Sequence, residues 1–130
     1  VNLGARLEGL TKFYGVPVLV SGELVERVPE YRFMELDRAR VKGRHEPVTL
    51  YQPLCLDSEL DAHTCEHVEK FEALLLAYRS QQWSQGLVLL EQMDAAVISP
   101  VLIALYRGRI ERAIECPADH WDAVHNHESK

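Results

Sequence analysis

The sequence predicts an α+β segment followed by an all-α tail, on the basis of three observations. Apolar residues recur at helical spacing near the start of the chain. Between residues 17 and 51, short runs rich in β-branched and aromatic residues alternate with glycine and proline. After residue 69 the apolar residues return to helical spacing. We therefore expect one unit over residues 1–54, a linker over 55–68 and a helical tail over 69–130.

The opening helix is predicted by one apolar stripe with spacings of four, three and four residues: Leu3, Leu7, Leu10 and Tyr14. Gly15 is expected to end this helix, as a glycine commonly does. Asn2 and Arg6 lie one turn apart on a different face. An amide and a guanidinium in this arrangement can hold one anionic group between them.

The following region reads as short strands around one brief helix. Residues 17–21 form a β-rich run, and residues 23–28 form a short helix that Pro29 stops. Residues 31–36 alternate as a half-buried strand that continues in extended form through 39–41. A basic turn over 42–47 leads to a last strand over 48–51.

This ordered set of motifs resembles the carboxyl-terminal half of a class III nucleotidyl cyclase catalytic domain. The matching stretches are residues 1–8, 15–21, 36–43 and 46–51. The resemblance covers about residues 1–54, and it is strongest to bacterial adenylate cyclases that end in a helical tail. It implies that the α+β segment is part of a ferredoxin-like cyclase domain.

The resemblance also implies a reaction, in which ATP becomes 3′,5′-cyclic AMP and pyrophosphate. Asn2 matches the asparagine that orients the ribose, and Arg6 matches the arginine that stabilises charge on the α-phosphate. Lys42 matches the lysine that contacts the terminal phosphates, and Arg44 keeps a second positive charge beside it. Loss of Arg6 is expected to cost on the order of 10²–10³ in rate, by analogy with the loss of one oxyanion-hole donor.

The metal ligands of such a site are expected outside this chain. In the family, two aspartates that bind two Mg²⁺ or Mn²⁺ ions precede the segment seen here, and two domains pair head to tail to complete each site. The resemblance therefore implies a homodimer, with no metal ligand in this chain and no activity from the chain alone. Asp37, followed by Arg38, is expected to form a surface ion pair.

Charge and cysteine content limit the possible partners and compartment. Residues 1–54 carry a net charge of +1 and residues 55–130 a net charge of −7, which argues against nucleic acid or an anionic membrane as partner. No apolar run reaches 18 residues and no signal peptide is seen. Three scattered cysteines suit a reducing cytoplasm. The resemblance also allows a parent protein anchored in a membrane through an upstream region.

The tail reads as three helical segments. The first stripe holds Phe71, Leu74, Leu75 and Tyr78, the second Leu87, Leu90 and Met93, and the third Leu102, Leu105, Tyr106, Ile110 and Ile114. Ser99 and Pro100 suit the start of the third helix. The order of aromatic, tryptophan and proline residues is similar to one tetratricopeptide unit, and a plain helical hairpin is the alternative. We expect Trp83 and Trp121 to be packing anchors, and the tail to pack on its own domain or on a protein partner.

The remaining histidines give weak motifs. His63 and His67 are spaced to share a zinc ion on a helix face, but no further ligand is evident and Cys65 points off that face, so solvated linker histidines are the expectation. The three histidines near the end are expected to lie in a frayed tail: His120, His125 and His127.

Two other functions remain open. The first is a guanylate-specific or degenerate cyclase, because the base-selecting residues precede this segment. The second is a non-enzymatic interaction module that binds a partner through the helical tail. In either case, strand 31–36 is expected to leave backbone and apolar faces exposed, so that the isolated chain self-associates.

Overall fold

The computed structural model describes residues 7–41 and 46–127, and the chain divides into two compact units. The first unit takes in Val1–Leu60 and Val124–Lys130, and the second takes in Asp61–Ala123. Within the described ranges the chain contains both α-helices and a four-stranded mixed sheet, so the predicted α+β class is confirmed.

The opening helix of the first unit ends where the sequence predicts. Residues 7 and 8 are helical, and α2 (Thr11–Tyr14) follows after a turn. Gly15 has a φ of 71°, and its N–H donates to Lys12 O. This left-handed conformation is the one that glycine adopts without a Cβ clash. Leu7 and Tyr14 are 2% and 0% exposed, as the apolar stripe predicts, whereas Leu10 is only half-buried.

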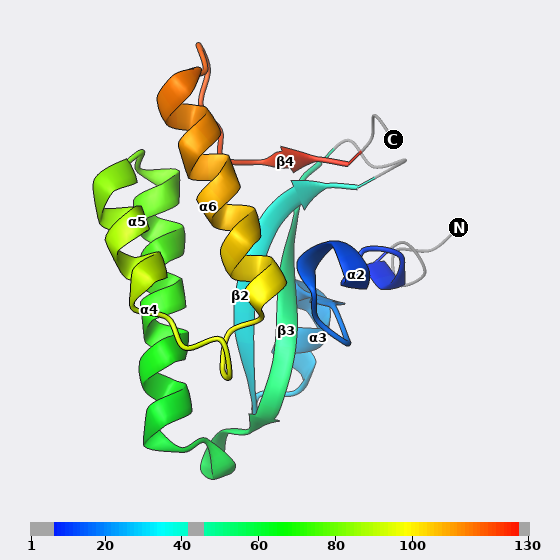
Figure 1. Ribbon diagram of the computed structural model, residues 1–130. Helices are drawn as coiled ribbons and strands as arrows, with labels where there is room; N and C mark the ends of the chain where they lie inside the picture. The colour runs from blue at the N-terminus through cyan, green and yellow to red at the C-terminus, as the bar shows by residue number, and fades with distance from the viewer. Residues whose placement is uncertain (1–6, 42–45, 128–130) are drawn as a thin grey trace. The chain divides into compact units, whose positions relative to one another are not determined.

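The sheet of the first unit has the strand order β1–β3–β2–β4. Its main part is an antiparallel pair of β2 (Tyr31–Arg40) and β3 (Val48–Leu56), drawn in Figure 1 as two long curved arrows. β1 (Val20–Ser21) pairs with β3, and α3 (Gly22–Arg27) follows it directly. β4 (His125–Asn126) comes from the far end of the chain and lies parallel to residues 39 and 40 of β2.

β2 agrees with the predicted extended stretch between residues 31 and 41, whereas β3 extends five residues beyond the predicted strand 48–51. Pro53 lies inside β3 opposite Phe33, next to a register shift, where a proline can sit without breaking the pairing. The stretch predicted as a linker, 55–68, contains the end of β3, the short helix η1 (Asp57–Glu59) and the first two turns of α4. Met34 and Leu36 are 1% and 0% exposed, so this apolar face of β2 is buried and not exposed as expected.

The second unit consists of three helices with identifiable start signals: α4 (Ala62–Arg79), α5 (Trp83–Glu91) and α6 (Pro100–Glu115). Asp61 caps α4, because its carboxylate accepts the Thr64 N–H at 2.7 Å. Ser99 Oγ accepts the Leu102 N–H at 3.4 Å, and Pro100 occupies the first turn of α6 as predicted. Gln81, which has a φ of 60°, lies in the turn that separates α4 from α5.

Aromatic and apolar side chains fill the second unit. Phe71, Leu74 and Tyr106 are each 0% exposed, and the Phe71 and Tyr106 rings meet edge to face at 5.6 Å. A Cβ added at Gly86 of α5 would come within 2.9 Å of the Ile110 side chain, so the absence of a side chain at Gly86 lets α5 and α6 approach closely.

A second aromatic group confirms the packing role predicted for the tryptophans. The Trp83 and Trp121 rings meet edge to face at 5.2 Å, and each also contacts Tyr78. Trp121 Nε1 donates to Arg79 O at 3.0 Å, so the segment after α6 is attached to the end of α4.

Candidate functional site

The four residues predicted to act on a nucleotide lie outside the described residues: Asn2, Arg6, Lys42 and Arg44. Their described neighbours are well anchored. Leu7, which directly follows Arg6, is 2% exposed, and Val41, which directly precedes Lys42, is 1% exposed. The described residues next to two of the predicted site residues are therefore buried.

A buried hydrogen bond joins these two segments. Tyr14, at the end of α2, donates its hydroxyl proton to Asp37 Oδ2 of β2 at 2.6 Å. Tyr14 is 0% exposed and Asp37 is 1% exposed. Hydrogen bonds are stronger in the protein interior, where water is excluded, than at the surface. The bond therefore connects the helix that follows Arg6 to the strand that precedes Lys42.

His127 completes a three-residue chain. Its Nε2 lies 2.9 Å from Tyr14 Oη. A phenol has one proton, and Tyr14 gives that proton to Asp37, so the Tyr14 oxygen accepts from His127 Nε2–H. The direction of donation is thus from His127 to Tyr14 to Asp37. Asp37 also accepts its neighbour's backbone N–H, that of Arg38, at 2.9 Å.

The end of the chain is held to the first unit by further contacts. The His127 backbone N–H donates to Arg40 O at 2.8 Å. The Phe13 ring lies 5.3 Å from the His125 ring and 4.9 Å from the His127 ring. His125 lies in β4, and His127 directly follows that strand and donates to β2, so the prediction of a frayed tail is wrong for both. His120 is exposed, as expected.

The prediction of a surface ion pair for Asp37 is also wrong. The register of β2 against β3 shifts between Glu35 and Asp37, so Leu36 is the extra residue of a bulge. A bulge breaks the alternation of faces along a strand, and Leu36 and Asp37 are both buried although they are adjacent. Alternation alone would have turned the carboxylate to the opposite side from Leu36.

Among the described residues of the first unit, no group of three or more histidine, cysteine, aspartate or glutamate side chains lies close enough together to hold a metal ion. Asp37 is buried, and its oxygens accept from Tyr14 and from the backbone.

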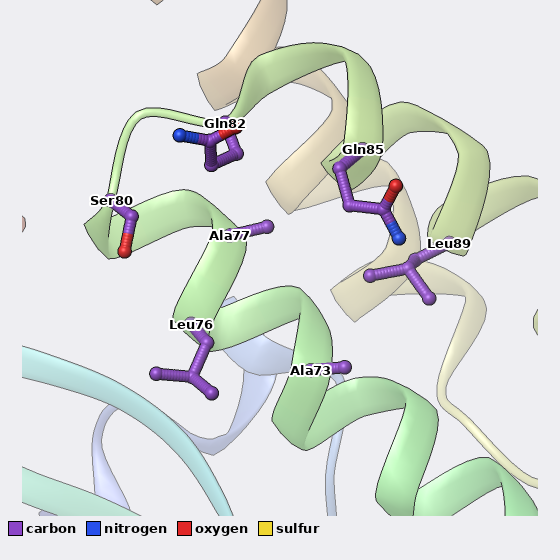
Figure 2. A pocket seen from close by; sticks show the side chains of 7 residues that line it. All are labelled: Ala73, Leu76, Ala77, Ser80, Gln82, Gln85 and Leu89. Carbon is purple, nitrogen blue, oxygen red and sulfur yellow. The ribbon is translucent and has the colours of Figure 1, made fainter.

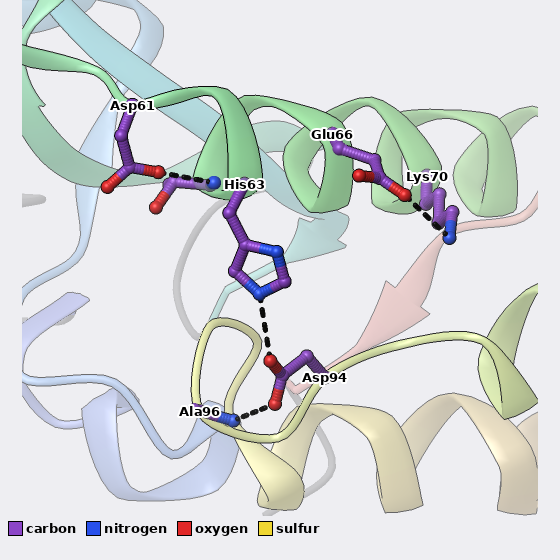
Figure 3. A network of polar contacts seen from close by, with 7 residues as sticks. Asp61, His63, Glu66, Lys70, Asp94 and Ala96 are labelled. Carbon is purple, nitrogen blue, oxygen red and sulfur yellow. Dashed lines mark hydrogen bonds and ion pairs between the residues drawn. The ribbon is translucent and has the colours of Figure 1, made fainter.

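A separate polar cluster lies in the second unit. His63 Nε2 is 2.9 Å from Asp94 Oδ2, and Asp94 Oδ1 accepts the Ala96 N–H at 2.9 Å (Figure 3). His67, one turn after His63 on α4, completes a group whose potential ligand atoms all lie within 4.8 Å of one another. The sequence indicated the histidine pair and missed Asp94, because Asp94 is 31 residues from His63 along the chain.

Hydrogen bonds favour the charged form of three exposed carboxyl groups in this unit. The Ala96 N–H, followed by His63, lowers the pKa of Asp94 below its ordinary 3.8. The Thr64 backbone N–H lowers the pKa of Asp61 in the same way. The hydrogen bond from Lys70 lowers the pKa of Glu66. Glu66 is therefore engaged with Lys70 on α4, one turn away.

An open groove of about 350 Å³ runs along α4 and α5 (Figure 2). Small and polar side chains line most of it, together with two leucines: Ala73, Leu76, Ala77, Ser80, Gln82, Gln85 and Leu89. Leu76 is 68% exposed, which is unusual for a leucine in the middle of a helix.

Comparison with known proteins gives one partial similarity. Adenylate cyclase 1 of Rhizobium meliloti (strain 1021) is 40% identical to this chain over 53 residues. The matched residues are 40% of this chain and only 8% of that protein. The chain is therefore similar to a small part of an adenylate cyclase. No family model matches the chain, and no solved structure matches it.

Two further observations concern membrane-spanning helices and the state of the cysteines. Among the described residues, no helix is both long enough and apolar enough to cross a membrane. The three cysteines are free thiols: Cys55, Cys65 and Cys116.

Proposed function

We propose that residues 1–54 are the carboxyl-terminal part of a class III adenylate cyclase catalytic domain with a ferredoxin-like fold. The proposed reaction converts ATP to 3′,5′-cyclic AMP and pyrophosphate. The observation that carries the proposal is the partial similarity to an adenylate cyclase, which is 40% identical to this chain over 53 residues. The order of the cyclase-like motifs in that segment supports the same function.

Each proposed site residue has a separate role. Asn2 orients the ribose, and Arg6 stabilises the charge that develops on the α-phosphate. Lys42, assisted by Arg44, binds the terminal phosphates. A planar guanidinium suits the oxygens of a reacting phosphate, whereas the ammonium of lysine acts as a point charge. When bound, Mg²⁺ or Mn²⁺ would neutralise phosphate charge, and its carboxylate ligands would come from the preceding half of the domain.

Two features of the first unit support the roles proposed for Arg6 and Lys42. In the sequence, Arg6 is followed by the buried Leu7, and Lys42 is preceded by the buried Val41. The hydrogen bond between Tyr14 and Asp37 connects α2 to β2. Positioning of this kind matters because small displacements of charge-stabilising groups reduce catalysis strongly. We assign Tyr14, Asp37 and His127 as positioning residues and not as groups that touch the nucleotide.

The proposal includes a homodimer and a cytoplasmic setting. In the head-to-tail arrangement, one copy supplies the metal ligands and the other supplies Asn2 and Arg6. Free thiols at all three cysteines fit the reducing cytoplasm, where ATP is available. The helical second unit is the proposed surface for a protein partner.

Complementation tests the proposal. The chain is mixed with the amino-terminal half of a class III cyclase domain that carries the two metal-binding aspartates, together with Mn²⁺ and either ATP or GTP. Cyclic nucleotide is expected from ATP. Arg6→Ala should lower the rate on the order of 10²–10³, because one stabilising donor is lost.

Arg27→Ala is the matched control. Arg27 is an exposed arginine of α3 in the same unit, and its replacement should leave the rate unchanged. Equal rates for the Arg6 and Arg27 variants would remove the catalytic role of Arg6. Product from GTP alone would support the guanylate-specific alternative. Absence of product, with capture of a protein partner by residues 61–123, would favour the interaction module.

A further inference from the structure

Three metal-ligating side chains meet in the second unit although they come from two separate segments. His63 and His67 lie one turn apart on α4, and Asp94 lies between α5 and α6. Their potential ligand atoms are all within 4.8 Å of one another, and the two imidazole rings are 4.7 Å apart. Histidines at positions i and i+4 of a helix are the spacing at which two imidazoles can share one ion.

The distances are close to those that an ion requires. Zinc bonds to nitrogen or oxygen are about 2.0–2.2 Å, which sets ligand atoms of a tetrahedral site roughly 3.3 Å apart. His63 Nε2 and Asp94 Oδ2 are already 2.9 Å apart. The side chains of these two residues are 59% and 41% exposed, so they are free to open slightly around an ion. Adjustments of roughly one ångström would therefore bring the three ligand atoms to the separations of a tetrahedral site.

His67 provides an independent indication of a ligand. The residue is only 5% exposed, and its Nδ1 is buried without a hydrogen-bond partner among the described residues. A buried polar atom left in this state costs about 1–3 kcal/mol. Packing an apolar side chain at this position would avoid that cost. A cation bound at Nδ1 would compensate for that cost.

Hydrogen bonds orient the Asp94 carboxylate toward His63, and other potential metal ligands nearby contact other residues. The Ala96 N–H binds Asp94 Oδ1, which leaves Oδ2 directed at His63 (Figure 3). Such outer hydrogen bonds commonly orient carboxylate ligands. Glu66 is paired with Lys70 at 3.2 Å, and Cys65 Sγ contacts Glu69 at 3.6 Å.

We propose that His63, His67 and Asp94 bind one Zn²⁺ ion. Two imidazoles and one carboxylate suit zinc, whereas Mg²⁺ and Ca²⁺ prefer oxygen ligands throughout. Three protein ligands leave a fourth position for water. The ion joins the first turns of α4 to the connection between α5 and α6, and so stabilises the second unit. This site is independent of the proposed nucleotide chemistry.

The test measures Zn²⁺ binding to the full chain after treatment with a chelator. All variants carry serine at the three cysteine positions, so that thiolates do not contribute. We expect one Zn²⁺ per chain by calorimetry and a rise of several degrees in Tm with saturating Zn²⁺. Co²⁺ as a probe should give the visible spectrum of a four-coordinate site.

His63→Ala and Asp94→Asn change exposed or half-exposed residues, and both should weaken Zn²⁺ binding at least tenfold. His120→Ala, an exposed histidine of the same unit, is the matched control and should bind as the parent does. His67→Gln should also weaken Zn²⁺ binding, and its circular dichroism spectrum is compared with that of the parent to show that the variant is folded. The proposal is overturned if no Zn²⁺ binds. It is also overturned if the His63 and Asp94 variants bind normally while replacement of His125 and His127 abolishes binding.

Discussion

The two units of this chain are stabilised by different kinds of contact. The second unit is one continuous segment, Asp61–Ala123, whose interior is mainly aromatic and apolar and also contains the buried side chains of His67 and Arg109. The first unit includes the segment that returns to it at Val124. The buried Tyr14 phenol and Asp37 carboxylate, together with the half-buried His127 imidazole, connect its helix, its sheet and that returning segment. We therefore expect the free energy of unfolding to fall most when a buried ring is removed from the second unit. In the first unit we expect it to fall when a buried hydrogen bond is lost.

The largest effect is expected from a cavity in the second unit. Phe71→Ala should lower the free energy of unfolding by about 3–5 kcal/mol, because a fully buried ring is removed. Leu76→Ala on the same helix should change it by less than about 0.5 kcal/mol, because Leu76 is 68% exposed. Urea unfolding followed by far-ultraviolet circular dichroism gives both values. Similar losses in the two variants would refute this description of the interior.

A smaller effect is expected in the first unit from the loss of one hydroxyl. Tyr14→Phe leaves the buried Asp37 carboxylate without its 2.6 Å donor, and should cost about 1–3 kcal/mol. Amide hydrogen exchange should show faster opening in β2 and little change in α4. Tyr31→Phe, a half-buried tyrosine of β2, is the control and should have little effect. Equal loss of protection in α4 would contradict the separation into two units.

His127→Ala should cost less than Tyr14→Phe, about 0.5–1.5 kcal/mol, because Asp37 keeps its bond to Tyr14. The comparison is made by denaturant unfolding against His120→Ala. A loss larger than that of Tyr14→Phe would show that His127, and not the Tyr14–Asp37 bond, is the main tie of the first unit.

The smallest effect concerns pH and the second unit. The pKa of Asp94 is lowered in the folded chain, so the carboxylate stabilises the fold at pH above 3.8, and this stabilisation is lost as the pH falls through the lowered value. Asp94→Asn should therefore flatten the decline of Tm below pH 4, measured with a chelator present. Asp119→Asn, which removes the charge of another aspartate of the second unit, is the control and should leave the decline of Tm unchanged. An unchanged pH profile for the Asp94 variant would contradict the assigned hydrogen bonds.

Periodicity was sufficient for the elements whose signals are local. The stripe of Phe71, Leu74 and Tyr78 predicted the buried face of α4, and Ser99 with Pro100 predicted the start of α6. Gly15 predicted the end of α2, where the structure has a positive φ. In each case the residues that determine the element lie within a few positions of one another.

Contacts between distant segments were not predictable in this way. Asp37 is buried because a bulge adds a residue to β2, and no residue type marks that bulge in the sequence. His127 reaches Tyr14 from 113 residues away, and Asp94 reaches His63 from 31 residues away. The histidine pair on α4 was visible from its spacing, but its third partner was not.

The central claim is that segment 1–54 carries the phosphate-binding half of a cyclase site, and a chimaera tests it most directly. Residues 1–54 replace the carboxyl-terminal part of the catalytic domain of an active class III adenylate cyclase, and cyclic AMP formation from ATP is measured. We predict an active chimaera whose rate falls on the order of 10²–10³ with Arg6→Ala and stays unchanged with Arg27→Ala. A folded chimaera that makes cyclic AMP equally fast with Arg6 replaced would contradict the claim.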